Sequence, residues 1–410
     1  MKSHLYNILP VICFSLIAAS CSDDIPMVSL GIDDSYRVAR MQKLRLQSAF
    51  TGAQYRWTLH RDNMPDTVVS TTRDYIFLAA DEGVYSLTFD VIDSDTPFSH
   101  DFTVNVMHEE IEYSPYIARV LEYCPAPGQF INEMPQWEEG DTYHDILQKA
   151  EDCISGKNEV MISLGAWGGY VTFAFDHTVI NRPGYDFLIH GNAFYELTQP
   201  DKRGGSAEPG IVYVSYDTNC NGLPDDEWYQ LAGSEYFNPL TRHNYTVTYH
   251  RPDPSREPVP DMTGFLNDIY YIPWEDSEGT IGYVAQNTFH DQNYFPRWVD
   301  GETLDFHGSR LPDNYADLSG MGTYYVLYSF DWGYADNHPN DYRDLNSFDI
   351  SWAVDKTGRS VPLPGIDFVR VMTGLNQYCG WLGETSTEIS GAIDLNIPTS
   401  PVIPDDPVID

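Results

Sequence analysis

Basic residues are scarce in this chain of 410 residues. It has 23 Lys and Arg against 61 Asp and Glu, which gives a formal net charge of −38 with His neutral. Such an excess of negative charge repels phosphate backbones and anionic lipid head groups at moderate ionic strength. Nucleic acid is therefore excluded as a partner. We expect most of the acidic residues to form a solvated surface and some of them to bind divalent cations.

The short motifs of common catalytic sites are absent as well. The sequence contains no GxSxG, HExxH, GxGxxG or phosphate-loop pattern, and its 12 His do not recur at metal-ligand intervals. Carboxylate pairs of the kind that glycosidases use are numerous, but among 61 acidic residues such pairs arise by chance. We therefore expect a binding protein and not an enzyme.

Cysteine is rare, with six residues and no CxxC or Cys/His spacing, so a zinc site is not expected. Two of the six, Cys13 and Cys21, lie in the N-terminal leader. In an exported chain the other four can form one or two disulfide bonds or remain buried free thiols, and the sequence does not fix a pairing. These four are Cys124, Cys153, Cys220 and Cys379.

The one long apolar run lies at the N-terminus. A positively charged start precedes an apolar stretch over 5–17, which is too short to span a bilayer, and small residues then lead to Cys21. This pattern predicts a signal peptide over 1–20 and a mature chain that begins at a diacylated Cys21. An uncleaved anchor helix or an ordinary secretory signal is the alternative.

The residues that follow the leader indicate where the protein is located. Ser22-Asp23-Asp24 resembles the acidic signal that directs lipoproteins of the Bacteroidetes phylum to the outer face of the outer membrane. We therefore expect a lipid-anchored protein of the outer membrane that faces the cell exterior.

Period-two alternation of apolar residues predicts an all-β protein of two domains. Residues 21–110 contain the alternating segments 54–59 and 83–91 and a final strand over 102–106. This part resembles a PKD-like or immunoglobulin-like β-sandwich, which on a surface lipoprotein acts as a spacer.

Residues 111–159 are expected to form a linker with one short helix. Asp141 is a suitable N-cap and Gly156 a suitable stop. The apolar stripe of this helix consists of Ile146, Leu147, Ala150 and Ile154.

Residues 160–397 form the larger domain, for which strands separated by long Asp-, Asn-, Gly- and Pro-rich loops predict a jelly-roll type β-sandwich. Half-buried strands are expected at 171–175, 245–249 and 348–354, and further strands at 211–216, 324–330 and 368–372. The Pro-rich, acidic tail over 398–410 is predicted to be disordered.

The loop from Asp217 to Glu227 has the spacing of a calcium-binding loop. Oxygen-bearing side chains occupy its first, third and fifth positions, Gly222 the sixth, and acidic residues follow, so that several oxygens can point at one Ca²⁺. The alternative is a hairpin loop rich in Asx turns without a metal. The expected ligands of a structural Ca²⁺ are Asp217, Asn219, Asn221, Asp225, Asp226 and Glu227.

Aromatic and amide side chains in loops predict a ligand-binding surface on the larger domain. Rings provide rigid contact area, and amides fix the orientation of a ligand. About half of the Trp residues in a sandwich of this size are expected to be buried, so the set is more informative than any of its members. The candidate ligand-binding residues are Trp167, Tyr170, Asn192, Trp274, Trp298, Trp332, Tyr334, Asn337 and Trp381.

Several stretches of the larger domain resemble the Bacteroidetes PKD-like cell surface lipoproteins. They are 171–176, 187–194, 208–212, 217–229, 363–369 and 379–389. Proteins of this kind are similar to the surface-exposed lipoproteins that bind vitamin B12, so the resemblance implies a corrinoid (cobalamin) ligand and a TonB-dependent transporter as partner. The residues themselves indicate only a binding domain. A surface glycan-binding module uses the same exposed rings and is the alternative, and a glycoside hydrolase is a further one.

The leader yields a direct test. The Cys21→Ala variant cannot be acylated, and we expect it to be released from the membrane fraction. Protease added to intact cells is expected to digest the wild-type protein. Complete protection of the wild-type protein in intact cells would exclude exposure on the surface.

Overall fold

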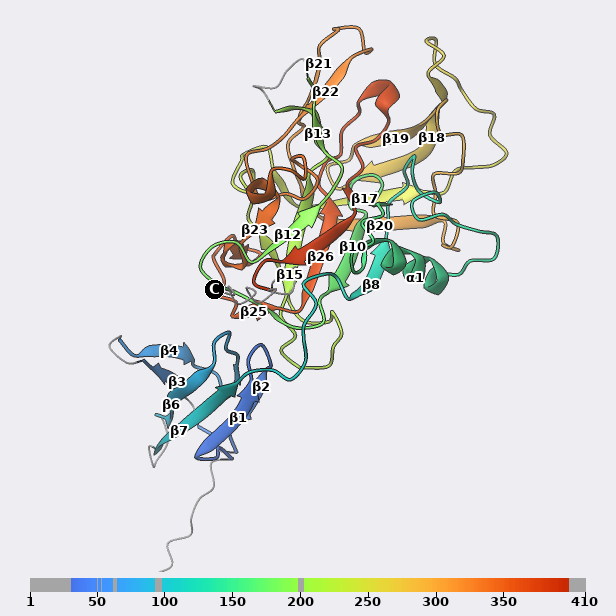
Figure 1. The fold of residues 1–410 in the computed structure, drawn as a ribbon. Coiled ribbons are helices and arrows are strands. Elements are labelled where there is room, and N and C mark those ends of the chain that lie inside the picture. The colour runs from blue at the N-terminus through green and yellow to red at the C-terminus, as the bar shows by residue number, and fades with distance from the viewer. Residues whose placement is uncertain are drawn as a thin grey trace, which may run out of the picture. The chain divides into compact units, whose positions relative to one another are not determined.

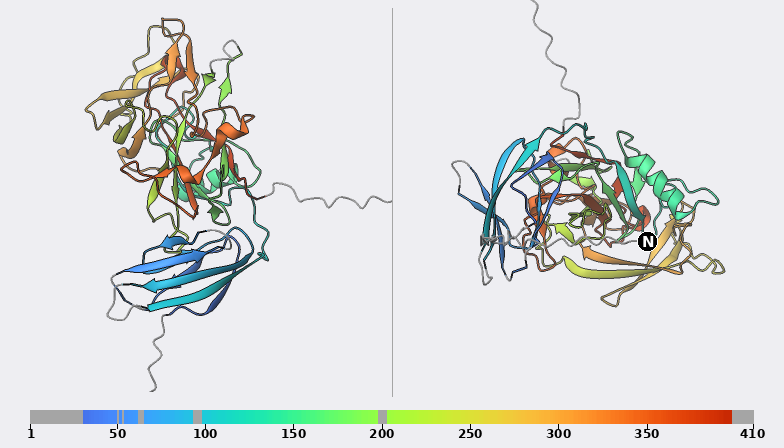
Figure 2. Two further views of the ribbon diagram at one scale, coloured as in Figure 1. Left: turned by 90° about the vertical axis from the view of Figure 1, so that its left-hand side faces the viewer. Right: turned by 90° about the horizontal axis from the view of Figure 1, so that it is seen from below.

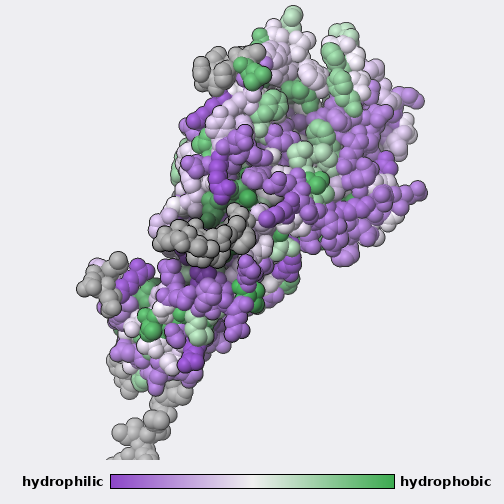
Figure 3. Space-filling view, viewed as in Figure 1, coloured by the Kyte–Doolittle hydropathy of each residue, from purple (hydrophilic) through white to green (hydrophobic). Residues whose placement is uncertain are grey.

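The structure is a computed structural model that describes residues 31–49, 51–52, 54–61, 65–92, 98–197 and 203–397. The predicted signal peptide, Cys21 and the predicted disordered tail lie outside these ranges. Among the described residues, no helix is both long and apolar enough to cross a membrane. Hydrophilic residues cover most of the face drawn in Figure 3, as the net charge predicts, and hydrophobic ones form small patches between them.

The smaller of two compact units is built around residues 46–75 and 86–103. Trp57 is fully buried at its centre, with its ring 4.1 Å from that of Phe89 and 6.1 Å from that of Phe102. The Trp57 Nε1 group donates a hydrogen bond to Thr72 O at 2.9 Å. The sheet has the order β1-β7-β6-β3-β4, with β1 (Ser35–Ala39), β3 (Tyr55–His60), β4 (Thr67–Ser70), β6 (Gly83–Val91) and β7 (Phe98–Met107), and β2 (Leu44–Gln47) pairs with β5 (Asp74–Phe77).

The larger unit is organised around a six-stranded antiparallel sheet. Its order is β24-β16-β15-β26-β10-β8. The strands are β8 (Arg119–Cys124), β10 (Tyr170–Ala174), β15 (Gly210–Ser215), β16 (Trp228–Leu231), β24 (Ala353–Val354) and β26 (Phe368–Thr373).

Both faces of this central sheet are buried. Alternate residues of β15 and β26 belong to two separate apolar clusters: Val212 and Val371 to one, and Ile211 and Met372 to the other. Residues 171–174 of β10 are all buried, so the prediction that this strand is half-buried is wrong. Its neighbours β26 and β8 pair along its two edges, one face packs into an apolar cluster through Val171 and Phe173, and Thr172 on the other face is bonded to the side chains of Glu122 and Arg370.

A four-stranded sheet of order β19-β18-β17-β20 contributes rings to the second cluster. It consists of β17 (Arg242–His250), β18 (Leu266–Asp276), β19 (Ile281–Asn287) and β20 (Thr303–Arg310). Four smaller sheets complete the unit (Figure 1): β23-β12-β28, β13-β14-β22-β21, β27-β9 and β11-β25. Their strands are β9 (Ile162–Ser163), β11 (Val179–Ile180), β12 (Phe187–His190), β13 (Phe194–Tyr195), β14 (Gly204–Ser206), β21 (Tyr315–Asp317), β22 (Tyr325–Tyr328), β23 (Ser347–Phe348), β25 (Gly365–Ile366), β27 (Glu388–Ile389) and β28 (Gly391–Asp394). The predicted all-β sandwich architecture is confirmed.

The predicted helix is α1 (Tyr143–Ile154), which lies on the outside of the larger unit (Figure 2) and contacts β8. Its stripe is confirmed, since Ile146, Ala150 and Ile154 are buried. Its N-cap is Thr142 and not Asp141. The Thr142 hydroxyl accepts from the backbone N–H of Asp145 and the Asp145 carboxylate accepts from that of Thr142, which forms a capping box.

The strand predicted over 348–354 is interrupted. Only β23 and β24 are extended, and a 3₁₀ turn, η3 (Ile350–Trp352), separates them. Asp349 begins this turn because its carboxylate accepts a hydrogen bond from the Ser351 N–H at 2.8 Å. The local hydrogen bond overrides the alternating pattern.

The four cysteines outside the leader are free. Cys379 is buried, Cys220 is exposed, and Cys124 and Cys153 are half-buried. The sequence left open whether these cysteines form disulfide bonds or remain buried free thiols. In the structure all four are free thiols, although Cys220 is exposed and not buried.

Because β10 is buried on both faces, its central ring is expected to be critical for folding. Phe173 is fully buried. We expect Phe173→Ala to lower the free energy of unfolding by about 3–5 kcal/mol, measured by denaturant titration. The control Ile281→Ala removes a side chain that is 71% exposed, and its effect should stay within about 0.5 kcal/mol. Equal effects of the two variants would contradict the central position of β10.

Candidate functional site

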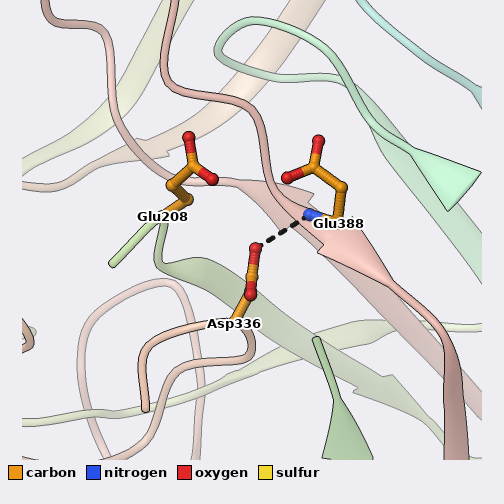
Figure 4. A group of neighbouring side chains, drawn as sticks. All are labelled: Glu208, Asp336 and Glu388. Carbon is orange, nitrogen blue, oxygen red and sulfur yellow. Dashed lines mark hydrogen bonds between the residues drawn. The ribbon is translucent and has the colours of Figure 1, made fainter. Parts of the chain in front are cut away.

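Three carboxylates from distant segments meet inside the larger unit (Figure 4). Glu208 precedes β15, Asp336 lies in the loop after β22, and Glu388 begins β27. One carboxylate oxygen from each lies within 4.8 Å of those of the other two. Asp336 and Glu388 are at most 1% exposed, whereas Glu208 is half-buried. We call these three residues the acidic triad.

Backbone N–H groups hold Asp336 in place. Its Oδ1 accepts from Asn192 N at 2.7 Å and Ala193 N at 2.8 Å, and its Oδ2 accepts from Glu388 N at 2.9 Å. A Cβ atom at Gly191 would lie 2.3 Å from Asp336 Oδ1, so only glycine allows this approach. The Asp336 carboxylate thus joins three segments of the chain.

Side-chain donors contact the other two carboxylates. Glu388 Oε1 accepts from Ser386 Oγ at 2.7 Å, and its Oε2 accepts from Asn192 Nδ2 at 3.3 Å. Glu208 Oε2 is 3.5 Å from Ser206 Oγ. No Lys or Arg of the described ranges forms an ion pair with any member of the triad.

Burial without a basic partner changes the acidity of the triad. Desolvation raises the pKa of Glu388 to about 8 and that of Asp336 to about 7, and it raises the pKa of Glu208 well above its usual range. Repulsion from neighbouring carboxylates raises the pKa of Glu208 and Glu388 further. Protons or a bound cation must compensate the buried charge. Carboxylate oxygens are the ligands that hard divalent cations prefer, so the triad can hold a metal ion.

A pocket of about 310 Å³ opens next to the triad, and we call it the acidic pocket. Glu208, Glu388, Asn192 and Glu384 are among its lining residues. Glu384 Oε1 accepts from Gln129 N at 2.6 Å, while its buried Oε2 has no hydrogen-bond partner in the described chain. Burial raises the pKa of Glu384 to about 8. This pocket therefore offers a ligand several oxygen acceptors, one of which is unpaired.

Aromatic rings flank the acidic pocket. Trp381 and Phe289 line it, with their ring centroids 5.9 Å apart, and Phe265 lies 6.2 Å from Trp381. Phe289 is 60% exposed and Phe265 40%. Trp381 is held by a hydrogen bond from its Nε1 to Thr323 O at 3.3 Å. Exposed apolar rings thus stand next to buried oxygen acceptors.

The structure distributes the nine predicted ligand-binding residues over several places. Asn192 and Trp381 share the acidic pocket. Trp167 and Trp274 line a second pocket of about 260 Å³, and Tyr170 lines a third of about 440 Å³. The nine residues do not form one continuous surface.

The remaining members have packing roles. Trp298 stacks on Tyr123 at 6.1 Å, and Trp332, which is 39% exposed, packs against Trp352 at 4.6 Å.

Three of the nine are interior residues, which corrects the expectation that they are surface groups. Trp167, Tyr334 and Asn337 are 0% exposed. Trp167 Nε1 donates to Ser309 O at 3.2 Å, and the Asn337 side chain exchanges two hydrogen bonds with the backbone of Phe330. Their polar atoms are already paired within the fold.

The loop predicted to bind calcium makes a network of internal hydrogen bonds. Asp217 Oδ2 accepts from Gly222 N at 2.9 Å, and the side chains of Asn219 and Asn221 both donate to Asp225. Glu227 accepts from the Tyr229 hydroxyl at 3.2 Å, and the Thr218 hydroxyl donates to Asp226. The hydrogen bonds that close turns are those of the Asx-turn alternative. Calcium binding at this loop stays a prediction.

Four residues of this site were not among those predicted from the sequence: Asp336, Glu208, Glu384 and Glu388. Glu384 and Glu388 flank the short polar stretch Thr385-Ser386-Thr387, with no basic residue nearby in the sequence. Two acidic residues separated by small hydroxyl residues can indicate buried carboxylates in a sequence, because such hydroxyls can donate hydrogen bonds to them.

Raised carboxyl pKa values predict how stability depends on pH. A carboxyl whose pKa is higher in the folded state contributes stability at low pH and loses it as pH rises through that pKa. For Glu388 the ordinary value is 4.5 and the folded value about 8. We expect the melting temperature of the metal-free protein to fall between these pH values, and Glu388→Gln to reduce this fall. If the melting temperature falls equally with pH in the wild type and in Glu388→Gln, the raised pKa of Glu388 is contradicted.

A cation at the triad is expected to counter this loss. Because Ca²⁺ neutralises ionised carboxylates, it should raise the melting temperature more at pH 8 than at pH 5. Glu388→Gln should weaken the effect at pH 8. The control Asp217→Ala changes only the predicted calcium loop, so any stabilisation that it abolishes belongs to that loop. Melting curves that are identical in chelator and in calcium would exclude both sites.

Comparison with known proteins finds little similarity. No model of a known protein family and no curated protein matches the sequence. A solved structure described as a SusE-like protein is similar with a TM-score of 0.22 and 10% sequence identity, over 86% of this chain and 92% of that chain. A TM-score of this size does not establish a common fold. The resemblance to PKD-like lipoproteins therefore has no matching family model.

Proposed function

We propose that this protein is a cell-surface lipoprotein that binds a glycan in the acidic pocket without converting it. The observation that carries the proposal is the combination, at one place, of exposed rings and buried oxygen acceptors. Trp381 and Phe289 supply the rings, and Glu384, Glu388 and Asn192 supply the polar groups.

This combination suits a sugar for physical reasons. A sugar ring has an apolar C–H face, which packs on an aromatic ring, and hydroxyl groups, which donate hydrogen bonds to carboxylates and amide oxygens. The unpaired Oε2 of Glu384 is a carboxyl oxygen that a sugar hydroxyl can satisfy, since a hydroxyl both donates and accepts. A half-buried aromatic ring next to a polar pocket therefore favours a glycan over a wholly apolar ligand.

The volume of the acidic pocket favours a glycan over the corrinoid that the sequence resemblance implies. A volume of about 310 Å³ is at the small end of the usual range for ligand pockets. It accommodates a sugar unit, whereas a corrinoid is much larger and would have to lie mainly outside. Cobalamin uptake with a TonB-dependent transporter remains an alternative that the same binding experiment tests.

A binding role is preferred to hydrolysis because one of the three triad carboxylates, that of Asp336, already serves the fold. Asp336 is fully buried, with both oxygens accepting backbone hydrogen bonds. Glycosidases need two carboxyl groups on either side of the scissile bond, each able to reach the substrate. Release of reducing sugar in the presence of the protein would contradict this part of the proposal.

Substitution of Trp381 tests the glycan site. We expect Trp381→Ala to weaken binding of the best ligand from a glycan panel by about tenfold or more, because a central ring typically contributes 1–2 kcal/mol or more. The matched control is Trp332→Ala, since Trp332 is also a partly exposed Trp but does not line the acidic pocket. Calorimetry on the purified protein measures both.

The same titration includes cyanocobalamin as a competitor. Binding of cyanocobalamin but of no glycan would replace the glycan with a corrinoid. Equal loss of glycan affinity in Trp381→Ala and Trp332→Ala would contradict the assignment of the pocket.

A further inference from the structure

A separate cavity of about 440 Å³ lies between the central sheet and the four-stranded sheet. The central sheet contributes Tyr170 from β10, Tyr213 from β15 and Trp228 from β16, and the four-stranded sheet contributes Phe306 from β20. It shares no lining residue with the acidic pocket. We call it the inter-sheet cavity.

A guanidinium group is fixed between two rings in this cavity. The Arg370 guanidinium carbon lies 4.4 Å from the Tyr170 ring centroid and 4.3 Å from that of Trp228. Its Nε donates to Thr172 Oγ1 at 3.0 Å and its Nη2 to Glu122 at 2.6 Å. Its Nη1 has no hydrogen-bond partner in the described chain. The side chain is thus oriented by four groups and retains free donors.

A second polar group of the inter-sheet cavity is unpaired. Gln230 is 8% exposed, and its Oε1 accepts from Ser309 Oγ at 2.8 Å. Its buried Nε2 has no partner among the described residues. A buried amide group without a partner is unfavourable, and a ligand hydroxyl that accepts from it removes this cost on binding.

Charged groups of both signs line the edge of the cavity. Asp355 pairs with Arg359 at 2.9 Å, whereas Asp305 is exposed and accepts from Thr248 Oγ1 at 2.5 Å. Lys356 lines the cavity, is exposed and forms no ion pair within the described ranges. Among the described residues, Arg370 pairs with Glu122 at 2.6 Å but keeps its Nη1 donors free, and Lys356 adds a positive charge without an ion pair, in a chain whose net charge is −38.

We propose that the inter-sheet cavity binds an acidic sugar, a pyranose ring that carries a carboxylate. Arg370 Nη1 donates to the carboxylate, and a ring hydroxyl accepts from Gln230 Nε2. Hydroxyl groups both donate and accept, which suits a cavity that is lined by an amide and a guanidinium. A neutral sugar leaves the Arg370 donors unpaired.

Two ligands that differ only in the carboxylate test this site. Sodium D-glucuronate and D-glucose are titrated into the purified full chain and followed by ligand-observed NMR and calorimetry. We expect glucuronate to bind about tenfold or more tightly than glucose, which is the usual contribution of a hydrogen bond to a charged group. Equal binding of both sugars, or binding of neither, would overturn the proposal.

Variants assign the binding to the inter-sheet cavity. Arg370→Lys keeps the charge but loses the planar donors, and Gln230→Met removes the amide at similar size, so each should weaken glucuronate binding. Thermal melting monitored by circular dichroism shows whether each variant is folded, and Trp228→Leu replaces either variant that is not.

Trp381→Ala separates the two sites. It changes the acidic pocket, so glucuronate binding in the inter-sheet cavity should persist in this variant even if the proposed glycan function fails. Loss of glucuronate binding in Trp381→Ala, with retention in Arg370→Lys, would move the ligand to the acidic pocket and overturn the inference.

Discussion

The candidate site depends on one buried carboxylate, that of Asp336. Its two oxygens accept backbone hydrogen bonds from the segment after β12 and from the start of β27. Its own loop is thereby tied to strands that are far apart in the sequence. A carboxylate that accepts several N–H groups is strongly stabilised in its ionised form, yet full burial acts in the opposite direction and raises its pKa. The positions of Glu388 and Asn192, and hence the wall of the acidic pocket, follow from this contact.

Burial of the central sheet on both faces explains why the acidic pocket and the inter-sheet cavity are separate. Residues of β15 and β26 alternate between two apolar clusters, so each face of the sheet packs against a different set of elements. The inter-sheet cavity lies where the second face meets the four-stranded sheet, and the acidic pocket is formed by loops that end near β27 and η4 (Gly380–Leu382). Trp228 directly follows the predicted calcium loop and also lines the inter-sheet cavity. The conformation of the predicted calcium loop therefore affects where Trp228 lies in the wall of the inter-sheet cavity.

Local patterns predicted most of the strands, and tertiary contacts decided the rest. The alternation in 83–91 predicts β6 with its observed bounds, and the stripe of α1 is correct. The segment 348–354 was predicted wrongly because the Asp349 side chain competes with strand pairing. The acidic triad could not be predicted, since Glu208, Asp336 and Glu388 come together only through the fold. For the same reason, Trp381 and Trp167 look alike in the sequence although only Trp381 stands beside the acidic pocket.

The two pockets show how a chain with so much negative charge can offer chemically different sites. At the acidic pocket the carboxylates have no basic partner, so protons, a cation or ligand hydroxyls must satisfy them. At the inter-sheet cavity, by contrast, Asp355 and Glu122 pair with arginine side chains, and a guanidinium between two rings retains free donors. The total charge of the chain therefore says little about either site. What distinguishes them is the group that a ligand meets, which is a set of carboxyl groups without a basic partner in the acidic pocket and a guanidinium with free donors in the inter-sheet cavity.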